Sequence, residues 1–289
     1  MSNLTKRVLT AVVGVPILYF IFYLGGILFL ILILLIILFG SIELLKLLET
    51  KGVQPERELV LVFSFVLGIA AYFGYFYFIA VFTFSVIIVF LSALRRNDLS
   101  DAINIISTTL FSIVYLGWLL SHAILLRNLE HNPGIKDYVQ TAQGLKDAGF
   151  FHIFFVVSCV FLNDTGAYFT GRWKGKRKLI PNISPGKTVE GTIGGIIFST
   201  IAGGVANLIF KAPIEYPLAF LFGFIIGVVA VFGDLFESLI KRSADVKDSG
   251  AILPGHGGIL DRFDSLIFTF PVFYYMVLLY YWLNGVSLI

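Results

Sequence analysis

The chain has 289 residues, of which 58% are hydrophobic and only 13% are charged. Soluble domains usually carry about a quarter of their residues as charged side chains, so the composition excludes an ordinary soluble protein and indicates an integral membrane protein. The net charge of +3 says little by itself, and we expect no nucleic-acid partner. The single cysteine, Cys159, excludes an intramolecular disulfide.

Nine apolar segments are predicted to cross the bilayer. About 20 apolar residues span a hydrocarbon layer ~30 Å thick as a helix, and a helix satisfies its own backbone hydrogen bonds there. The segments cover residues 8–24, 27–45, 59–76, 77–94, 103–126, 149–170, 192–210, 216–240 and 266–285. The fold class is therefore all-α and polytopic. We expect one integral membrane domain over residues 1–289, with five helices in 1–127 and four catalytic helices in 149–289.

The first apolar segment resembles a signal peptide, because Lys6 and Arg7 precede it. No small-residue cleavage site follows, and a second apolar run starts after Gly25-Gly26. We therefore interpret the first segment as a retained span.

The distribution of Lys and Arg predicts the orientation. With the N-terminus in the cytoplasm, seventeen of the 21 Lys and Arg residues fall on the cytoplasmic side. The four on the opposite side are Arg127, Lys136, Lys146 and Lys211. The loops 171–191 and 241–265 then face the cytoplasm. We expect a multi-pass protein of the cytoplasmic (inner) membrane, with its N-terminus and its active site on the cytoplasmic side.

The first charged cluster covers residues 163–191. Asp164 lies inside an apolar run, where an acid marks either a functional site or a helix–helix hydrogen bond. Six cations follow it: Arg172, Lys174, Lys176, Arg177, Lys178 and Lys187. Residues 184–188 resemble a phosphate-contacting turn before a helix whose N-terminus favours an anion, although the full P-loop spacing is missing. The cations from Arg172 to Lys178 are equally compatible with an anchor on anionic lipid.

The second charged cluster begins inside the eighth apolar run. Asp234, Glu237, Ser238 and Lys241 are spaced so that all four share one face of a helix. Asp261 and Asp264 are also three residues apart, and their carboxylates point the same way if the ninth helix begins near them. Structural ion pairing at helix ends is the alternative role for these acids.

Taken together, these acids, cations and glycines favour phosphoryl or nucleotidyl transfer. Mg²⁺ prefers carboxylates, waters and substrate phosphates to a full protein cage. The glycines of the 254–258 turn permit a close backbone approach by a ligand. The nearby cations that would bind phosphate are Lys241, Arg242, Lys247 and Arg262. A zinc site at His256 is not expected, because the other histidines lie far away in the sequence.

Residues 238–264 carry a specific resemblance. Its fixed positions are Ser238, Lys241-Arg242, Lys247-Asp248, Pro254-Gly255-His256-Gly257-Gly258, Asp261-Arg262 and Asp264. This pattern resembles the signature of the CDP-diacylglycerol synthases, also called phosphatidate cytidylyltransferases. Residues 163–191 are similar to the second motif of that family, except that many members carry Lys and Trp where this chain has Gly186 and Val189.

The resemblance implies the reaction of CTP with phosphatidate to give CDP-diacylglycerol and diphosphate, dependent on Mg²⁺ and compatible with a second cation. By motif position, it implies that Asp234, Asp261 and Asp264 are metal ligands and that Lys241 and Arg262 act at the phosphates. The implied substrate-binding residues are Asp164, Lys187, Ser238, Arg242, Lys247, Asp248, His256, Gly257 and Gly258. The implied partners are CTP, phosphatidate and membrane lipids.

Two alternatives remain open. A cytidylyltransferase for another lipid phosphate, such as an ether-linked lipid, shares the chemistry. A transporter would also place acids and lysines in the membrane, but it would predict repeated halves with paired broken helices, and no repeat is visible. Small residues in 191–204, including Gly194, Gly195, Gly203 and Gly204, permit close helix contacts, so a homodimer is also compatible with the sequence.

Overall fold

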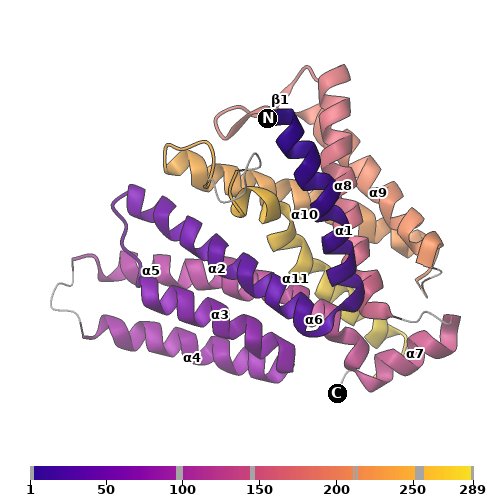
Figure 1. Ribbon diagram of the computed structural model, residues 1–289, viewed down its shortest axis with the longest axis horizontal. Coiled ribbons are helices and arrows are strands. Elements are labelled where there is room, and N and C mark those ends of the chain that lie inside the picture. Colours follow the sequence, from indigo (N-terminus) through magenta and orange to yellow (C-terminus); the bar gives the residue numbers. More distant parts are fainter. Residues whose placement is uncertain are drawn as a thin grey trace. The chain divides into compact units, whose positions relative to one another are not determined.

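The protein is almost entirely helical in the computed structural model, which describes residues 3–95, 100–143, 147–210, 212, 214–250 and 257–287. Figure 1 shows the helices and one small hairpin. The elements are α1 (Asn3–Leu24), α2 (Gly26–Thr50), α3 (Arg57–Phe73), α4 (Tyr75–Ala93), α5 (Ala102–Ser112), η1 (Ile113–Trp118), α6 (Leu119–Arg127), η2 (Asn128–His131), α7 (Pro133–Gln143), α8 (Ala148–Lys174), β1 (Lys178–Ile180), β2 (Ser184–Thr188), α9 (Val189–Phe210), α10 (Tyr216–Ser243) and α11 (Leu260–Leu283).

The all-α, polytopic class predicted from the sequence is confirmed. Each of the nine predicted segments coincides with helix, and η1 and α6 continue α5 as a single rod. Among the described residues, seven helical segments are long and apolar enough to cross a bilayer. The other two predicted spans fall short: α3 has 17 residues, and the apolar part of α1 in the described region covers only Val12–Leu24.

The chain divides into two compact units. The first unit comprises Met1–Leu125 and Ile240–Phe263, and the second comprises Leu126–Leu239 and Asp264–Ile289. The long helices α10 and α11 therefore contribute to both units. The prediction of a single domain over residues 1–289 stays a prediction.

In the first unit, α2, α3 and α4 lie side by side. Gly74 has a φ of 126°, a value that L side chains rarely adopt, and it separates α3 from α4 close to the predicted break. The fully buried Phe78 ring of α4 stacks on Trp118 of η1 with 4.1 Å between ring centroids. A Cβ at Gly117 would lie 2.7 Å from the Ser64 Cα atom, so this glycine lets η1 contact α3 closely.

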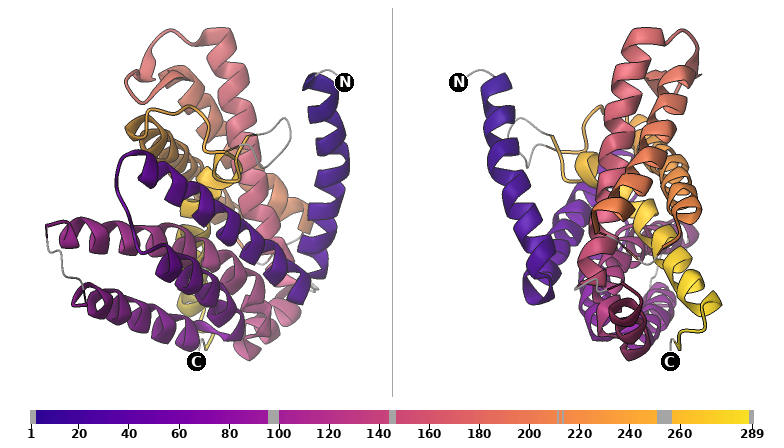
Figure 2. Two further views of the ribbon diagram at one scale, coloured as in Figure 1. Left: turned by 60° about the vertical axis from the view of Figure 1, so that its left-hand side comes forward. Right: turned by 90° about the vertical axis from the view of Figure 1, so that its right-hand side faces the viewer.

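In the second unit, α8 and α9 are in extensive contact, and Figure 2 shows them side by side. Glycines on α9 allow this approach. A Cβ at Gly194 would lie 2.2 Å from Thr170 Oγ1, and one at Gly195 would lie 2.7 Å from the Asn163 carbonyl oxygen. Gly203 is in similarly close contact with the backbone of Ala219 in α10. These small residues serve contacts within the unit, and the homodimer stays a prediction.

The residues between the predicted segments 103–126 and 149–170 contain the helix α7. Arg127, at the end of α6, is buried and contacts Glu130 at 2.7 Å and Asp147 at 2.8 Å. Asp147 also accepts a hydrogen bond from the Phe150 amide at 2.7 Å, which caps the N-terminus of α8.

Residues 184–188, predicted as a turn, instead form β2, which pairs with β1 in an antiparallel hairpin. The helix boundaries also differ. Arg172 lies in the last turn of α8, and Lys241 and Arg242 lie in the last turn of α10. Arg172 and Arg242, predicted in loops, therefore lie on helix ends, whereas Lys241 lies on the same helix as Asp234, as its spacing indicated.

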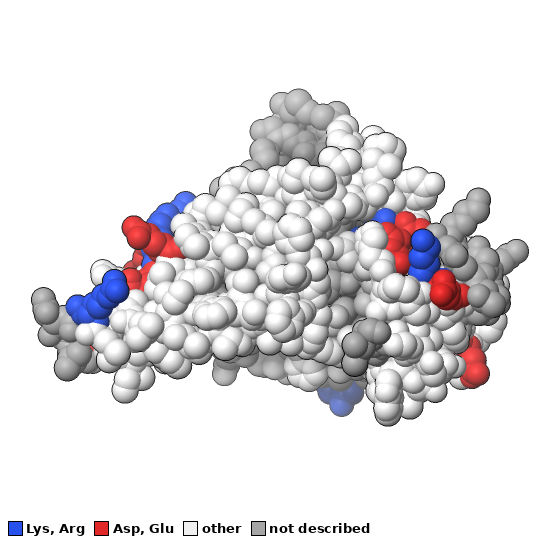
Figure 3. All heavy atoms as spheres, turned by 90° about the horizontal axis from the view of Figure 1, so that it is seen from below, with Lys and Arg blue, Asp and Glu red and all other residues white. Residues whose placement is uncertain are grey.

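Much of the protein surface is apolar. Large hydrophobic side chains such as Phe76, Ile103 and Leu208 are more than half exposed. Most of the face drawn in Figure 3 carries neither acidic nor basic side chains, and its charged residues gather in a few places. A surface of this kind is expected against lipid, where exposed apolar side chains are favourable.

Candidate active site

The second unit contains a cleft of about 550 Å³. One wall comes from α8, with Asn163, Asp164, Tyr168 and Arg172. The facing walls come from β2, α9 and α10, with Lys187, Thr188, Gly191, Thr192, Val231 and Asp234 among the lining residues. The cleft thus brings acids and cations from two distant parts of the sequence together.

Local hydrogen bonds fix the walls of this cleft. Thr188 Oγ1 accepts a hydrogen bond from the Gly191 amide at 3.1 Å and caps the N-terminus of α9. The buried Asn163 side chain donates from Nδ2 to the Gly227 carbonyl oxygen at 2.9 Å, which connects α8 to α10. Glu190 accepts hydrogen bonds from the Lys176 and Arg177 amides at 3.0 and 3.2 Å, so the hairpin is held against the start of α9.

Lys187 and Asp234 form an ion pair in the cleft. The Lys187 side chain is 25% exposed and the Asp234 side chain is 30% exposed, so both remain accessible to a ligand. The sequence predicted Lys187 as a phosphate-binding cation and Asp234 as a metal ligand. In this structure the two groups neutralise each other.

Asp264 lies close to this pair. A Cβ at Gly233 would lie 2.7 Å from the Asp264 carbonyl oxygen, so α10 and α11 are in close contact one residue before Asp234. The charges of Asp234, Asp164 and Lys187 all act on the Asp264 carboxyl group. Asp164 and Asp234 both line the cleft, and their charges act on Asp264 of a third helix. The shared metal role of Asp234 and Asp264, which the family resemblance implied, stays a prediction.

The donor set suits Mg²⁺ bound together with phosphate. Among the described residues, no group of three or more His, Cys, Asp or Glu side chains is arranged as a complete metal site. Mg²⁺ does not require one, because it is commonly bound by one or two carboxylates together with waters and substrate phosphates. Asp234 and Asp264 supply that number of carboxylates, so the residues present fit the ion.

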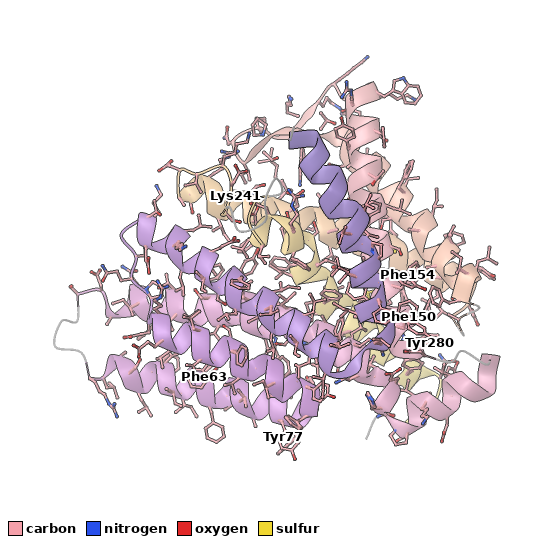
Figure 4. All side chains as sticks on the ribbon, viewed as in Figure 1. Phe63, Tyr77, Phe150, Phe154, Lys241 and Tyr280 are labelled. Atoms are coloured by element: carbon pink, nitrogen blue, oxygen red, sulfur yellow. The ribbon has the colours of Figure 1, made fainter. Side chains whose placement is uncertain are left out.

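Asp261, the third predicted ligand, belongs to the first unit and lies one helical turn before Asp264 in α11. Its carboxylate is heavily hydrogen-bonded. Lys241 Nζ lies 2.6 Å from Oδ1, and Figure 4 labels Lys241 near the end of α10. The other oxygen, Oδ2, accepts from the Ser249 amide at 3.1 Å, the Ser249 hydroxyl at 3.1 Å and the Gly258 amide at 2.9 Å. The metal role of Asp261 stays a prediction.

The other predicted site residues are distributed between helix ends and the segment after α10. Ser238 lies one turn after Asp234 and is half-buried, whereas Arg242, Lys247, Asp248 and Arg262 are exposed. Gly257 has a φ of 86°, which a side chain would strain, and Gly258 is buried. His256 lies outside the described residues. The roles of all of these residues stay predictions.

Sequence reasoning missed several residues of the site. Asn163, Tyr168 and Thr192 line the cleft without carrying a charge, and only their position on the same helices as Asp164 and Lys187 could have indicated them. Outside this cleft, in the first unit, Glu43 is buried and accepts hydrogen bonds from the Ile259 and Leu260 amides. Its signal in the sequence was an acid inside an apolar run.

The fold and the cleft together define a multi-pass helical membrane protein whose charged cleft suits phosphate groups and a divalent cation. Comparisons with known proteins specify the family. The sequence profile described as "Cytidylyltransferase family" matches residues 5–280. The chain is 33% identical to the phosphatidate cytidylyltransferase of Bacillus subtilis strain 168 over 97% of this chain and 100% of the relative.

Two further relatives agree. The phosphatidate cytidylyltransferase of Synechocystis sp. is 33% identical over 95% of this chain and 97% of its own. That of Staphylococcus saprophyticus is 49% identical over 44% of this chain and 49% of its own. The chain therefore belongs to the cytidylyltransferase family, as residues 238–264 predicted.

Proposed function

We propose that this protein is a phosphatidate cytidylyltransferase, which converts CTP and phosphatidate to CDP-diacylglycerol and diphosphate in phospholipid biosynthesis. The observation that supports the proposal is the cleft of the second unit, which Lys187 and Asp234 line and whose charges act on Asp264, in a chain of this family. Full-length relatives named as phosphatidate cytidylyltransferases support the substrate assignment.

The chemistry needs no covalent enzyme intermediate. A phosphate oxygen of phosphatidate is already a nucleophile at neutral pH, and it attacks the α-phosphorus of CTP in line. The new phosphorus–oxygen bond forms as the bond to the bridging oxygen of the β-phosphate breaks, and diphosphate leaves. The obstacle is the repulsion between two anions, so positioning and charge neutralisation perform most of the catalysis.

The cleft residues fit these tasks. Lys187 would exchange Asp234 for a substrate phosphate, which frees the Asp234 carboxylate for a cation. Arg172, on the last turn of α8, would bind a second phosphate group. Asp234 and Asp264 would hold Mg²⁺, which supplies charge neutralisation at the phosphates when it is bound. Any second cation is part of the same proposal.

The location in the membrane follows from the substrates. Phosphatidate keeps its acyl chains in the bilayer and CTP is soluble, so the reaction belongs at the membrane surface. The excess of Lys and Arg in the loops supports a cytoplasmic position for that surface under the positive-inside rule. We therefore propose a cytoplasmic active site in the inner membrane.

A direct assay tests the function. Purified protein in detergent is incubated with Mg²⁺, phosphatidate and CTP labelled in the cytidine, and both the labelled lipid and the diphosphate are measured. Equal amounts of the two products are expected, and neither without phosphatidate. An ether-linked lipid phosphate in a parallel reaction distinguishes the alternative substrate. Movement of CTP across vesicles without diphosphate release would instead indicate a transporter and refute the proposal.

A further inference from the structure

Glu43 is a buried acidic residue of the first unit. It lies on α2, and the residue is 2% exposed. Its Oε1 accepts a hydrogen bond from the Ile259 amide at 3.0 Å. Its Oε2 accepts from the Leu260 amide at 3.0 Å and lies 3.1 Å from the Ser249 hydroxyl. A buried charge is costly unless it is hydrogen-bonded in this way, so these contacts explain how an acid is tolerated in α2.

The partners of Glu43 lie on both sides of one chain segment. Ser249 precedes residues 250–258, and Ile259 and Leu260 follow them at the start of α11. One carboxylate therefore holds both ends of the segment and also caps α11. Two glycines make this approach possible. A Cβ at Gly250 would lie 2.4 Å from Glu43 Oε1, and one at Gly258 would lie 2.6 Å from Oε2.

A chain of polar contacts leads from Glu43 to the end of α10. The Ser249 hydroxyl lies 3.1 Å from Glu43 Oε2 and also 3.1 Å from Asp261 Oδ2. Asp261 Oδ1 in turn contacts Lys241 Nζ at 2.6 Å. The Lys241 and Asp261 side chains are only 14% and 9% exposed. A displacement of the Glu43 carboxylate would therefore displace Ser249, and through Ser249 the Lys241–Asp261 ion pair.

We propose that Glu43 is a positioning residue for CTP use: from α2 it sets the two ends of the 250–258 segment and the Lys241–Asp261 pair. This inference rests on the proposed function. It gives the N-terminal helices, which carry none of the residues predicted for the site, a defined part in substrate binding. Glu43 itself touches no reacting atom in this role.

Glu43→Gln tests the proposal with almost no change in side-chain volume. The carboxamide keeps one acceptor oxygen and places an NH₂ group against the amides of Ile259 or Leu260, so a donor faces a donor. Glu49→Gln is the matched control, because Glu49 lies on the same helix but is 44% exposed and pairs with Arg57 at 3.3 Å. Ser249→Ala removes only the bridging hydroxyl and carries the test if Glu43→Gln cannot be purified folded.

We expect Glu43→Gln to raise the KM for CTP by about tenfold or more, because a hydrogen bond to a buried charged group has a strength that corresponds to at least this factor. The kcat should change much less. Ser249→Ala should raise the KM in the same direction by a smaller factor, and Glu49→Gln should not. Amide hydrogen exchange in peptides covering residues 245–262 should be faster in Glu43→Gln than in Glu49→Gln.

The outcomes separate this inference from the proposed function. Failure of the wild-type protein to form the liponucleotide refutes the function, whereas the exchange measurement still tests the contacts of Glu43. An unchanged KM for CTP in folded Glu43→Gln, in a protein whose wild type is active, overturns the positioning role. The positioning role is also overturned if Glu43→Gln lowers only the kcat, in proportion to the amount of folded protein that is lost.

Discussion

Lys187, near the end of β2, and Asp234, on α10, form an ion pair in the cleft of the second unit. The proposed reaction requires Lys187 to bind a phosphate group and Asp234 to bind a cation. Substrate and metal must therefore compete with an internal ion pair. Because both side chains are partly exposed, the pair is worth at most about 1 kcal/mol, and ligands can displace it easily.

Asp234→Asn should slow product formation by at least about 10²-fold while the protein still inserts and folds. The amide keeps the shape of the side chain but loses the charge that would bind a cation, and loss of one such electrostatic contact typically slows turnover by about 10²–10³. Labelled CTP and phosphatidate measure the rate. Asp137→Asn, on the exposed surface of α7, is the control for loss of one carboxylate. Near-normal turnover in Asp234→Asn would reject the role of Asp234.

Lys187→Ala should change two constants in opposite directions. The KM for CTP should rise by about tenfold, because a cation that binds phosphate is lost. The Mg²⁺ concentration for half-maximal rate should fall by up to about fivefold, because Asp234 no longer pairs with Lys187. Initial rates over a grid of CTP and Mg²⁺ concentrations give both values.

The control for Lys187→Ala is Lys136→Ala, which removes an exposed cation on α7. A higher Mg²⁺ requirement in Lys187→Ala would contradict the competition between Lys187 and the metal for Asp234. Addition of excess EDTA to the wild-type protein should stop the reaction, and Mg²⁺ should restore it.

The helices of this protein could be predicted because apolar runs of sufficient length leave few alternatives in lipid. The break between the third and fourth segments was predicted at residues 76–77, within three residues of Gly74, which separates α3 from α4. The hairpin at 178–188 was not predictable in the same way. Its strands are short and contain Lys, Pro and Gly, so they lack the alternation that indicates a strand. The helix α7 was missed because its polar sequence has no apolar run.

The same limits apply to the candidate site: some of its residues could be predicted from the sequence and others could not. The acids were visible in the sequence because charges are rare in apolar segments, and α10 and α11 are in close contact at Gly233 and Asp264. The partners of each acid were not visible, since they depend on contacts between residues far apart in the chain. Glu43 and Ser249 are separated by 206 positions. Lys241 and Asp261 likewise pair although they lie on different helices, α10 and α11.

Gly194→Ala should destabilise the contact between α8 and α9. The added Cβ would lie 2.2 Å from Thr170 Oγ1 and 2.5 Å from its Cβ, so one helix must shift. Overpacking of this kind typically costs about 1–3 kcal/mol. Gly186→Ala is the matched control, because nothing lies within 4 Å of a Cβ at that position. Thermal unfolding in detergent should show a lower midpoint for Gly194→Ala only, and equal midpoints would contradict the packing.

Arg127→Met should lower stability without altering the cleft. Arg127 is 1% exposed, and its guanidinium contacts the carboxylates of Glu130 and Asp147. Removal of one member of a buried ion-pair network leaves charge without a partner and typically costs about 3–5 kcal/mol. Asp147 also caps α8, so its displacement should weaken the first turn of the helix that carries Asp164.

A lower unfolding midpoint is expected in detergent, whereas the KM for CTP, measured well below that midpoint, should stay at the wild-type value. An unchanged midpoint would show that Glu130 and Asp147 do not depend on Arg127, and a raised KM would mean that this network acts on the cleft.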